Sequence, residues 1–481
     1  MRLSALAGQA PSGDDPDIAG LTADSRAVRP GFLFAALPGA KADGAAFVRD
    51  AVARGAVAVL GGEGLMGQDA GVPLIIDANP RLRLAMMAAR FHPRQPETIV
   101  AVTGTNGKTS VASFTRQIWA FLGHPAASFG TVGIVSPKGT RGLSHTTPDP
   151  VEIHRLLDEL AAEGVTHAAF ESSSHGLAQY RADGVRLKAA GFTNLTRDHL
   201  DYHQTLEAYE AAKLRLFLEV LPADGVAVIN ADGAGADAFV RAVRRRGMRL
   251  LAVGEQGEDL RMTARAPVGD GQQVSVSWQG RDFTFLLPLA GAFQASNALV
   301  AAGLVLATGG EAARVFAALA GLAGAPGRLE KIGTTAAGVP VYVDYAHTPD
   351  ALETVLKALR PHARGRLWVV FGCGGDRDAG KRPLMGAAAK ALADRVIVTD
   401  DNPRTETAAL IRAAVLQGAA GALEIGDRAL AIAAAVDGAE PGDVVVVAGK
   451  GHEAGQIIGR EVLPFNDADE VRAAIARTRT G

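Results

Sequence analysis

The chain has 481 residues, of which 48% are hydrophobic, and this length fits about three domains of ~150 residues, each with its own core. Its 49 Lys and Arg residues nearly balance its 51 Asp and Glu residues, so the net charge of −2 argues against a basic surface for nucleic acid or membranes. A single cysteine excludes internal disulfides and cysteine-based zinc sites, and no window approaches the roughly 18 apolar residues of a membrane span. We therefore expect a cytoplasmic multidomain protein without a membrane span.

The first segment, residues 1–95, alternates short apolar runs with helical stretches. Apolar runs predict strands at 32–37, 56–60 and 73–77, and the spacing within 80–91 predicts a helix. The segment ends at the proline pair of 92–96, which indicates a linker. We expect it to be an α/β domain.

A glycine loop follows the next predicted strand, residues 98–102. The loop reads Thr103-Gly-Thr-Asn-Gly-Lys-Thr109, and a helix is expected after it. Backbone N–H groups at the two glycines would surround phosphate oxygens, Lys108 would supply a positive charge, and Thr109 would ligate Mg²⁺. The general GTPase pattern needs a glycine where Val102 stands, so an ordinary GTPase or transport ATPase is disfavoured.

Strands and helices alternate through the second segment, residues 96–326. The sequence predicts strands at 166–171, 189–194, 225–230 and 250–253, a hairpin within 275–287, and a helical run at 206–218. This alternation predicts a mainly parallel sheet with helices on both faces.

The pattern breaks again at Gly324-Ala-Pro-Gly-Arg328, which marks the start of a third segment, residues 327–481. Its β-branched runs lie at 339–345, 367–371, 396–399 and 444–448, with helical stretches between them. These runs predict a second open α/β sheet, whose ligands should lie beyond the carboxyl ends of the strands.

Polar side chains follow two strands of the second segment. Glu171-Ser-Ser-Ser-His175 comes after one strand, and Thr193 to His203, which is rich in His and Asp, comes after another. Carboxylate and imidazole groups at this edge could bind a second divalent cation, with oxygen ligands favouring Mg²⁺. The alternative for each residue is an ordinary hydrogen-bonded loop side chain, and for Lys213 it is a solvated helix face.

Taken together, these motifs resemble the Mur ligase family over essentially the whole chain. The matching segments, in the order seen in the family, are 103–109, 171–175, 194–203 with Lys213, 344–349, 374–378 and 449–453. The resemblance implies an N-terminal α/β domain that binds UDP, a central P-loop-type sheet, and a C-terminal Rossmann-like α/β domain.

The resemblance also implies an activity and its partners. Members of the family use ATP and Mg²⁺ to form an amide bond through an acyl phosphate, in the synthesis of the peptidoglycan stem peptide. The motif Asp401-Asn-Pro-Arg404 resembles the motif of the members that add meso-diaminopimelate to UDP-N-acetylmuramoyl-L-alanyl-D-glutamate, since lysine-adding members lack that arginine. We expect a monomer that acts on these small molecules.

Site residues are carried over from the family motifs. Lys108, His199 and Lys213 would be catalytic, with Lys213 carbamylated, and Mg²⁺ would be held by Thr109, Glu171, His199 and the Lys213 carbamate. ATP would contact the loop residues Gly104, Thr105, Asn106, Gly107, Lys108 and Thr109, and further along the chain Asn297, Arg328, Asp344 and His347.

The two remaining substrates would use other residues. The UDP-muramoyl-dipeptide would contact Ser25, Thr146, Thr147, Ser173, Gln179 and Arg181. Diaminopimelate would contact Arg377, Asp401, Asn402, Pro403, Arg404, Gly449 and Glu453, because an arginine suits its distal carboxylate and Glu453 its distal ammonium.

The sequence departs from the family pattern at a few positions and leaves alternatives open. Gln294 stands where the family has Asn, Ser172 replaces an apolar residue, and the usual acidic-Pro continuation is missing after Arg404. A lysine-adding ligase would keep everything except Arg404. Folylpolyglutamate synthase shares the ATP loop but does not need the N-terminal domain, and a non-catalytic nucleotide switch would not need Glu171 and His199.

Overall fold

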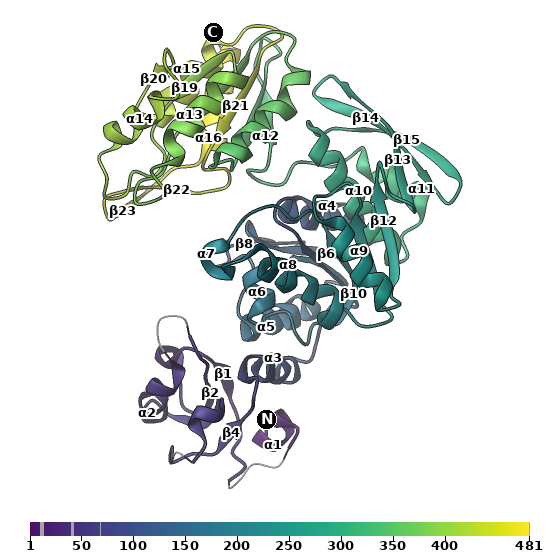
Figure 1. Ribbon diagram of the computed structural model, residues 1–481, viewed down its shortest axis with the longest axis vertical. Coiled ribbons are helices and arrows are strands. Elements are labelled where there is room, and N and C mark those ends of the chain that lie inside the picture. Colours follow the sequence, from purple (N-terminus) through teal and green to yellow (C-terminus); the bar gives the residue numbers. More distant parts are fainter. Residues whose placement is uncertain (10–13, 40–42, 68, 481) are drawn as a thin grey trace. The chain divides into compact units, whose positions relative to one another are not determined.

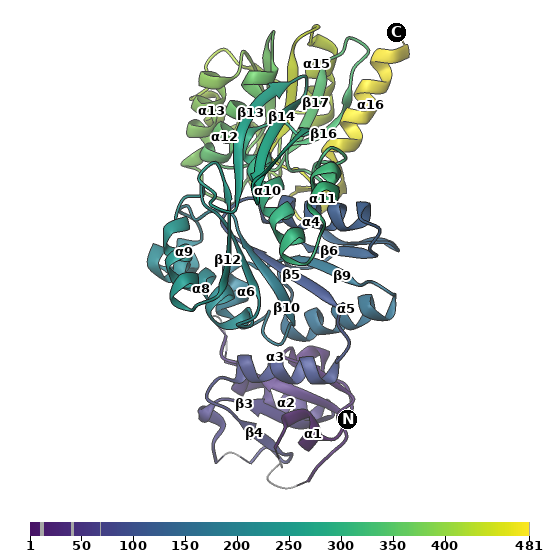
Figure 2. The same ribbon diagram turned by 90° about the vertical axis from the view of Figure 1, so that its right-hand side faces the viewer.

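The computed structural model describes residues 1–9, 14–39, 43–67 and 69–480 (Figures 1 and 2). Residues 1–108, 119–252 and 303–309 form one compact unit, and residues 109–118, 253–302 and 310–481 form a second. Both units are α/β, as predicted from the alternation of strands and helices. Among the described residues, we find no helix with the length and apolarity that a membrane span requires.

The N-terminal sheet is parallel, with the strand order β1-β2-β3-β4. Alternate residues of β2 face opposite sides: Leu33 packs with helices α1 and α3, whereas Phe34 packs with α2. Asn79 caps the predicted helix α3, whose first residue is Pro80. The elements are α1 (Leu3–Ala7), β1 (Gly20–Thr22), η1 (Ser25–Ala27), β2 (Phe32–Ala36), η2 (Gly44–Phe47), α2 (Val48–Ala53), β3 (Ala56–Gly61), η3 (Glu63–Leu65), β4 (Leu74–Ile76) and α3 (Pro80–Phe91).

The central sheet of the first unit has the strand order β12-β11-β10-β5-β9-β6-β7-β8. Strand β5 pairs in parallel with β9 and β10, so the loops after these three strands emerge at one edge. Its strands are β5 (Thr98–Thr103), β6 (Ala126–Gly130), β7 (Gly133–Ser136), β8 (Gly139–Arg141), β9 (His167–Glu171), β10 (Leu187–Phe192), β11 (Val226–Asn230) and β12 (Arg249–Gly254). Strands β6 to β8 were not predicted: β6 reads Ala-Ala-Ser-Phe-Gly and contains no β-branched residue, and β7 and β8 are only 4 and 3 residues long.

Two helices of the central segment pack apolar side chains against this sheet. Helices α5 and α9 share a buried cluster on one face of the sheet, and Asp149 caps α5. The predicted helix at 206–218 is α8, which changes into a π-helix after Arg215. The helices are α4 (Lys108–Phe121), α5 (Pro150–Ala162), α6 (Ser174–Ala178), α7 (Leu200–His203), α8 (Leu206–Arg215), η4 (Leu216–Val220) and α9 (Ala236–Arg245).

The second unit contains an antiparallel ladder and the C-terminal sheet. The ladder is β13 (Leu260–Val268), β14 (Gly271–Trp278) and β15 (Arg281–Leu287), followed by α10 (Ala292–Ala307) and α11 (Ala312–Leu319). The predicted hairpin within 275–287 corresponds to β14 and β15.

The C-terminal sheet has the order β16-β17-β21-β18-β19-β20 and is parallel except for β16. Val369 of β18 packs with α12, α13 and α14, while Val370 packs with α15 and α16, so both faces are covered. The elements are β16 (Glu330–Thr334), β17 (Pro340–Asp344), α12 (Pro349–Leu359), η5 (Arg360–His362), β18 (Leu367–Phe371), α13 (Lys381–Leu392), β19 (Arg395–Val398), α14 (Ala408–Leu416), β20 (Leu423–Glu424), α15 (Arg428–Gly438), β21 (Val444–Ala448), β22 (Gly455–Ile458), β23 (Glu461–Pro464) and α16 (Asp467–Thr480).

Candidate active site

The predicted phosphate loop joins β5 to α4. Gly104 has φ +147°, and a Cβ there would lie 1.9 Å from the Thr193 hydroxyl, so only glycine fits. The Asn106 N–H donates to the Asn194 side-chain oxygen at 3.1 Å, and the Thr105 N–H donates to the Asn194 carbonyl at 2.8 Å. The loop after β10 therefore holds the glycine loop in place.

Two lysines meet at one backbone oxygen of this loop. Nζ of Lys108 donates to the carbonyl oxygens of Gly104 and Thr105 at 2.9 and 2.8 Å, and Nζ of Lys213 donates to the same Gly104 oxygen at 2.8 Å. The Lys213 side chain is buried and lies 4.5 Å from the centre of the Tyr209 ring. Burial, and then the charge of Lys108, lower the pKa of Lys213 well below its usual value.

Glu171 ends β9 with a buried, fixed carboxylate. Its two oxygens accept hydrogen bonds from the N–H of Thr131 at 2.7 Å and from the Thr131 hydroxyl at 3.1 Å. Thr131 follows β6, one of the strands that the sequence analysis did not predict. The residue that orients Glu171 could therefore not be recognised from the sequence.

His199 lies in the loop before α7 with φ +52° and a side chain that is 45% exposed. Its backbone N–H donates to the Asp198 carboxylate, and its ring centre lies 4.9 Å from that of His175. Within the described part of the chain, no group of His, Cys, Asp and Glu side chains forms a complete metal site. Mg²⁺ commonly takes only one or two carboxylates together with phosphates and water, so Glu171 suits it without such a cage.

The residues predicted to bind the muramoyl-dipeptide cluster around α6. The Thr147 hydroxyl donates to the Glu171 carbonyl and accepts the Ser173 N–H, each at 2.9 Å. Arg181 donates to the Thr147 carbonyl at 2.6 Å and to the Gln179 side-chain oxygen at 2.7 Å. The hydroxyl of Thr146 lies 3.0 Å from that of Thr131. The structure thus connects five of these residues to the Glu171 region.

Ser25 lies elsewhere in the same unit, at the start of the short helix η1. Its neighbours Asp24 and Arg26 form an exposed ion pair at 2.8 Å, and Asp24 also accepts the Arg26 N–H. Ser25 itself is partly exposed. The pairing of Asp24 with Arg26 fixes the turn that presents the Ser25 hydroxyl.

The predicted adenine and linker residues are joined in the second unit by Gln294. Its side-chain oxygen accepts from Asn297 at 3.3 Å, and its side-chain nitrogen donates to the Arg328 carbonyl at 3.0 Å. The departure from the family pattern at Gln294 therefore ties these residues together. Nε of Arg328 is buried without a hydrogen-bond partner in the described structure, which fits a guanidinium that receives an anion.

Asp344 ends β17 with both carboxylate oxygens occupied. They accept the N–H groups of Leu329 and Ala346 at 2.6 and 2.7 Å. Burial raises the pKa of Asp344 to about 6, although the charge of Arg328 and these two bonds oppose the rise. His347 lies three residues further on, with Nδ1 2.9 Å from the Tyr345 carbonyl.

The predicted acceptor residues meet at the carboxyl ends of β18, β19 and β21. Arg404 has φ +51°, and the hairpin β22–β23 holds it: its N–H donates to the Ile457 carbonyl at 3.0 Å, and its carbonyl accepts the Gly459 N–H at 2.7 Å. Its guanidinium donates to the Gly375 carbonyl at 2.8 Å. Pro403, which directly precedes Arg404, is buried.

Four other residues of the predicted acceptor set lie close to one another in pairs: Asp401 with Gly449, and Asn402 with Glu453. Gly449 has φ +118°, and a Cβ there would lie 2.7 Å from the Asp401 carboxylate. Asn402 donates to Glu453 at 2.9 Å. Arg377 is exposed at the edge of this group. The predicted set is therefore assembled from loops that are far apart in the sequence.

Comparison with known proteins shows the family of this chain. Three family descriptions match the chain: "Mur ligase family, catalytic domain" over residues 17–92, "Mur ligase middle domain" over 102–305, and "Mur ligase, glutamate ligase domain" over 327–451. The chain belongs to the Mur ligase family. The domain boundaries at 95/96 and 326/327 stay predictions.

Individual relatives are similar over nearly the whole chain. A UDP-N-acetylmuramoyl-L-alanyl-D-glutamate–2,6-diaminopimelate ligase of Bradyrhizobium diazoefficiens is 58% identical, covering 96% of this chain and 95% of the relative. Its counterpart in Agrobacterium fabrum is 56% identical, with 96% and 94% covered. A solved structure of a ligase with the same name has a TM-score of 0.75 at 36% identity, covering 100% of this chain and 99% of that one.

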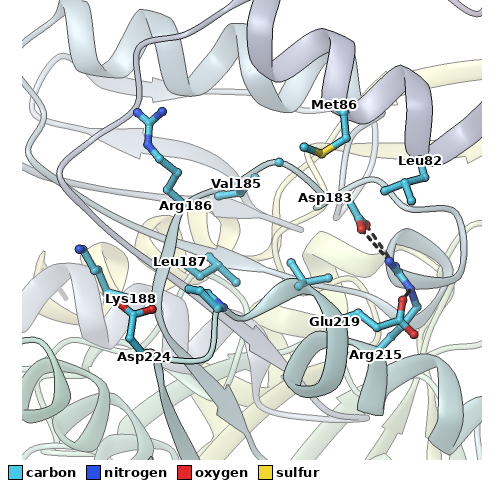
Figure 3. A pocket seen from close by; sticks show the side chains of 14 residues that line it. Leu82, Met86, Asp183, Val185, Arg186, Leu187, Lys188, Arg215, Glu219 and Asp224 are labelled. Atoms are coloured by element: carbon cyan, nitrogen blue, oxygen red, sulfur yellow. Dashed lines mark hydrogen bonds and ion pairs between the residues drawn. The ribbon is translucent and has the colours of Figure 1, made fainter. Parts of the chain in front are cut away.

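A separate pocket of about 570 Å³ lies in the first unit at the amino ends of β10 and β11 (Figure 3). The phosphate loop follows the carboxyl end of β5, so this pocket is on the opposite edge of the sheet. It is bordered by Asp183 and Arg215, a buried bidentate pair at 2.6 and 3.1 Å. The guanidinium also lies 3.9 Å from the centre of the Tyr180 ring, beside the predicted substrate residues Gln179 and Arg181.

Several functional neighbours were missed by the sequence analysis. Thr131 holds Glu171, Tyr209 lies under Lys213, and Lys450 bonds Glu453. Lys450 lies inside one of the recognised motifs. The motif indicated that this position matters, but it did not show which residues Lys450 contacts. Nothing in the sequence spacing connects Thr131 to Glu171, which lies 40 residues away.

Proposed function

We propose that this protein is an ATP-dependent ligase that joins meso-diaminopimelate to UDP-N-acetylmuramoyl-L-alanyl-D-glutamate in peptidoglycan precursor synthesis. The γ-carboxylate of D-glutamate attacks the γ-phosphate of ATP, giving an acyl phosphate and ADP. An amine of diaminopimelate then attacks the acyl carbon, and phosphate leaves from the tetrahedral intermediate. Because the reaction consumes ATP and a nucleotide-linked precursor, we place it in the cytoplasm.

Bringing a carboxylate to a triphosphate requires positive charge. The Lys108 ammonium and the N–H groups of the glycine loop hold the phosphates. Thr109, Glu171, His199 and the Lys213 carbamate would hold Mg²⁺, which would offset the remaining repulsion between the two anions. Thr131 keeps the Glu171 carboxylate in one orientation for this purpose.

The Lys213 amine, when neutral, is suited to carbamylation. Carbamate formation joins the Lys213 nitrogen to the carbon of CO₂ and releases one proton, and only an unprotonated amine has the electron pair for this step. Burial and the adjacent Lys108 lower the pKa of Lys213, which favours that unprotonated form. The carbamate oxygens are hard ligands of the type that Mg²⁺ prefers.

Acceptor recognition uses both charged ends of diaminopimelate. Arg404 pairs with the distal carboxylate, and Glu453 with the distal ammonium, which leaves the other amine free to attack. Asp401 and Asn402 belong to the same loop, and a side chain at Gly449 would enter the space of the Asp401 carboxylate.

Two fixed charges carry the proposal: the β22–β23 hairpin holds Arg404, and Asn402 holds the Glu453 carboxylate, so the chain offers both charges that a diamino dicarboxylate requires. The test is a panel of amino acids supplied with UDP-muramoyl-dipeptide and ATP, with the product identified by mass. A product with diaminopimelate alone supports the proposal. A product with lysine, or turnover only with a folate, contradicts it.

A further inference from the structure

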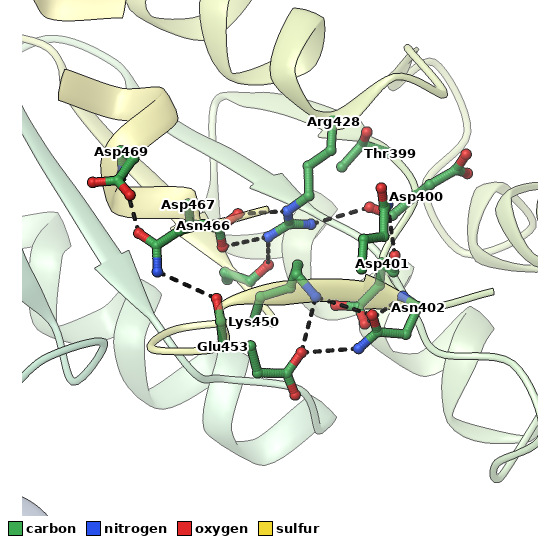
Figure 4. A network of polar contacts seen from close by, with 12 residues as sticks. Thr399, Asp400, Asp401, Asn402, Arg428, Lys450, Glu453, Asn466, Asp467 and Asp469 are labelled. Carbon is green, nitrogen blue, oxygen red and sulfur yellow. Dashed lines mark hydrogen bonds and ion pairs between the residues drawn. The ribbon is translucent and has the colours of Figure 1, made fainter. Parts of the chain in front are cut away.

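Lys450 follows β21 and is a buried cation to which the reaction described above gives no role. Its side chain is 0% exposed, and its Nζ donates to Asn402 Oδ1 at 3.0 Å and to Glu453 Oε2 at 2.9 Å (Figure 4). A fully buried ammonium is costly unless it is paired and hydrogen-bonded. Both of its side-chain partners belong to the predicted acceptor pocket.

Asn402 closes this group into a triangle. Its Nδ2 donates to the same Glu453 oxygen at 2.9 Å, while its Oδ1 also accepts the Ile457 N–H at 2.9 Å. Lys450 and Asn402 therefore both fix Oε2 of Glu453. The Glu453 side chain is 33% exposed, so the carboxylate still faces solvent and can meet a ligand.

The charges behind the triangle are paired among themselves. Arg428 and Asp467 are completely buried and joined by two bonds of 2.7 Å, and Arg428 donates to the Ala448 carbonyl at 3.0 Å (Figure 4). Arg428 is therefore paired with Asp467. The cation that directly contacts Glu453 is Lys450.

We propose that Lys450 is a positioning residue: it fixes the Glu453 carboxylate and thereby sets the preference of this pocket for an acceptor that carries a distal ammonium. The inference rests on the proposed function, in which Glu453 pairs with that ammonium. It assigns Lys450 no contact with the acceptor itself.

Electrostatics agree with this geometry. Burial opposes ionisation of Glu453, but the hydrogen bond and charge of Lys450, followed by the Asn402 bond, outweigh burial and lower its pKa. The other charged or titratable groups that interact with Glu453 are His452, Tyr345, Asp401 and Arg428. Without Lys450, its hydrogen bond and charge no longer oppose the effect of burial, so the pKa of Glu453 should rise.

The test compares two acceptors, meso-diaminopimelate and 2-aminopimelate, which differ only in the distal amine. In Lys450→Met, the ratio of kcat/KM for the two acceptors should fall by about 10- to 100-fold. KM for ATP and for the UDP-dipeptide should stay unchanged. The KM of the variant for diaminopimelate should also decrease as pH rises through the acid range, because its Glu453 ionises at higher pH than in the wild type.

Further variants separate positioning from folding. Lys450→Gln retains a donor for Asn402 and replaces the methionine variant if that one does not fold. Glu453→Gln should lower the ratio similarly, and the double variant Lys450→Met with Glu453→Gln should lower it no further. Lys357→Met is the matched control, since Lys357 forms an exposed pair with Glu353 four residues away.

The outcomes are distinct. An unchanged acceptor ratio in a folded Lys450 variant, or additive losses in the double variant, would overturn the inference while leaving the proposed function intact. A wild-type enzyme that does not use diaminopimelate would overturn the proposed function itself.

Discussion

Lys108 and Lys213 meet at one carbonyl oxygen of the glycine loop but differ in how deeply they are buried. Lys108 and Lys213 both donate to the Gly104 carbonyl, but Lys213 is 1% exposed whereas Lys108 is only partly buried. Two ammonium groups at one oxygen repel each other, and the more deeply buried one loses its proton more readily. The lowered pKa therefore belongs to Lys213, the more deeply buried of the two lysines.

Replacement of Lys213 tests the carbamate. We expect Lys213→Ala to be nearly inactive, because the anion that would help to hold Mg²⁺ is missing. Acetate or formate at high concentration should partly restore activity by occupying the vacated position. Activity is measured as phosphate release at a series of carboxylate concentrations, with the same salts added to the wild type as a control. A fully active Lys213→Ala enzyme would refute the carbamate.

Arg404 offers a test of acceptor choice. Arg404→Ala should lose about 2–4 kcal/mol of diaminopimelate binding through the lost charge-assisted pair, and lysine, which has no distal carboxylate, should be affected much less. The measurement is the ratio of kcat/KM for the two amino acids. Arg472→Ala, which removes an exposed arginine of the same unit, serves as the control. A ratio equal to that of the wild type would show that Arg404 does not recognise the carboxylate.

At the scale of secondary-structure elements, the site depends on loops held by neighbours that are distant in the sequence. The end of α8 shows this: Arg215 donates to the Leu177 carbonyl at 2.6 Å and stacks on Tyr180, whose φ is +58°. The change from α8 to a π-helix occurs at this residue, and such changes often mark functional regions. One side chain thus links the helix that carries Lys213 to the loop that carries Gln179 and Arg181.

Breaking this link should be costly. Arg215→Ala leaves the Asp183 carboxylate buried and unpaired, so we expect a loss of about 3–5 kcal/mol in the free energy of unfolding and a raised KM for the UDP-dipeptide. Urea unfolding and steady-state kinetics measure the two effects.

A comparison variant tests the cause of that loss. Replacing both partners, as Arg215→Met with Asp183→Leu, should recover part of the stability because no charge remains buried. Arg155→Ala, in an exposed pair with Glu159, should change stability by less than about 1 kcal/mol. Equal losses in Arg215→Ala and Arg155→Ala would contradict a buried ion pair.

At the scale of the whole molecule, the buried Asp344 affects stability as a function of pH. Its pKa is raised to about 6, so the folded state binds a proton more tightly than the unfolded chain does. Stability from this residue is therefore present at low pH and is lost as pH rises toward 6, a change of about 3 kcal/mol over two units.

The variant Asp344→Asn removes this dependence. Its stability relative to the wild type should increase between pH 4 and pH 6.5 and then stay constant. Thermal unfolding at a series of pH values measures the difference, with Asp469→Asn, an exposed carboxylate, as the control. A stability difference that does not change with pH would contradict the raised pKa.

Local sequence was sufficient for much of this protein. The strands at 367–371 and 444–448, the helix at 80–91 and the phosphate loop could be predicted because apolar spacing and glycine positions act within a few residues. The acceptor roles of Arg404 and Glu453, which lie in recognisable motifs, stay predictions.

Contacts between distant segments were decided only by the tertiary structure. Thr131 meets Glu171, Arg215 meets Asp183, and Lys450 meets Asn402 across 48 residues. Such pairs leave no periodic signal in the chain, because their proximity depends on which strands become neighbours in a sheet. The lowered pKa of Lys213 follows the same rule, because its burial and its approach to Lys108 exist only after folding.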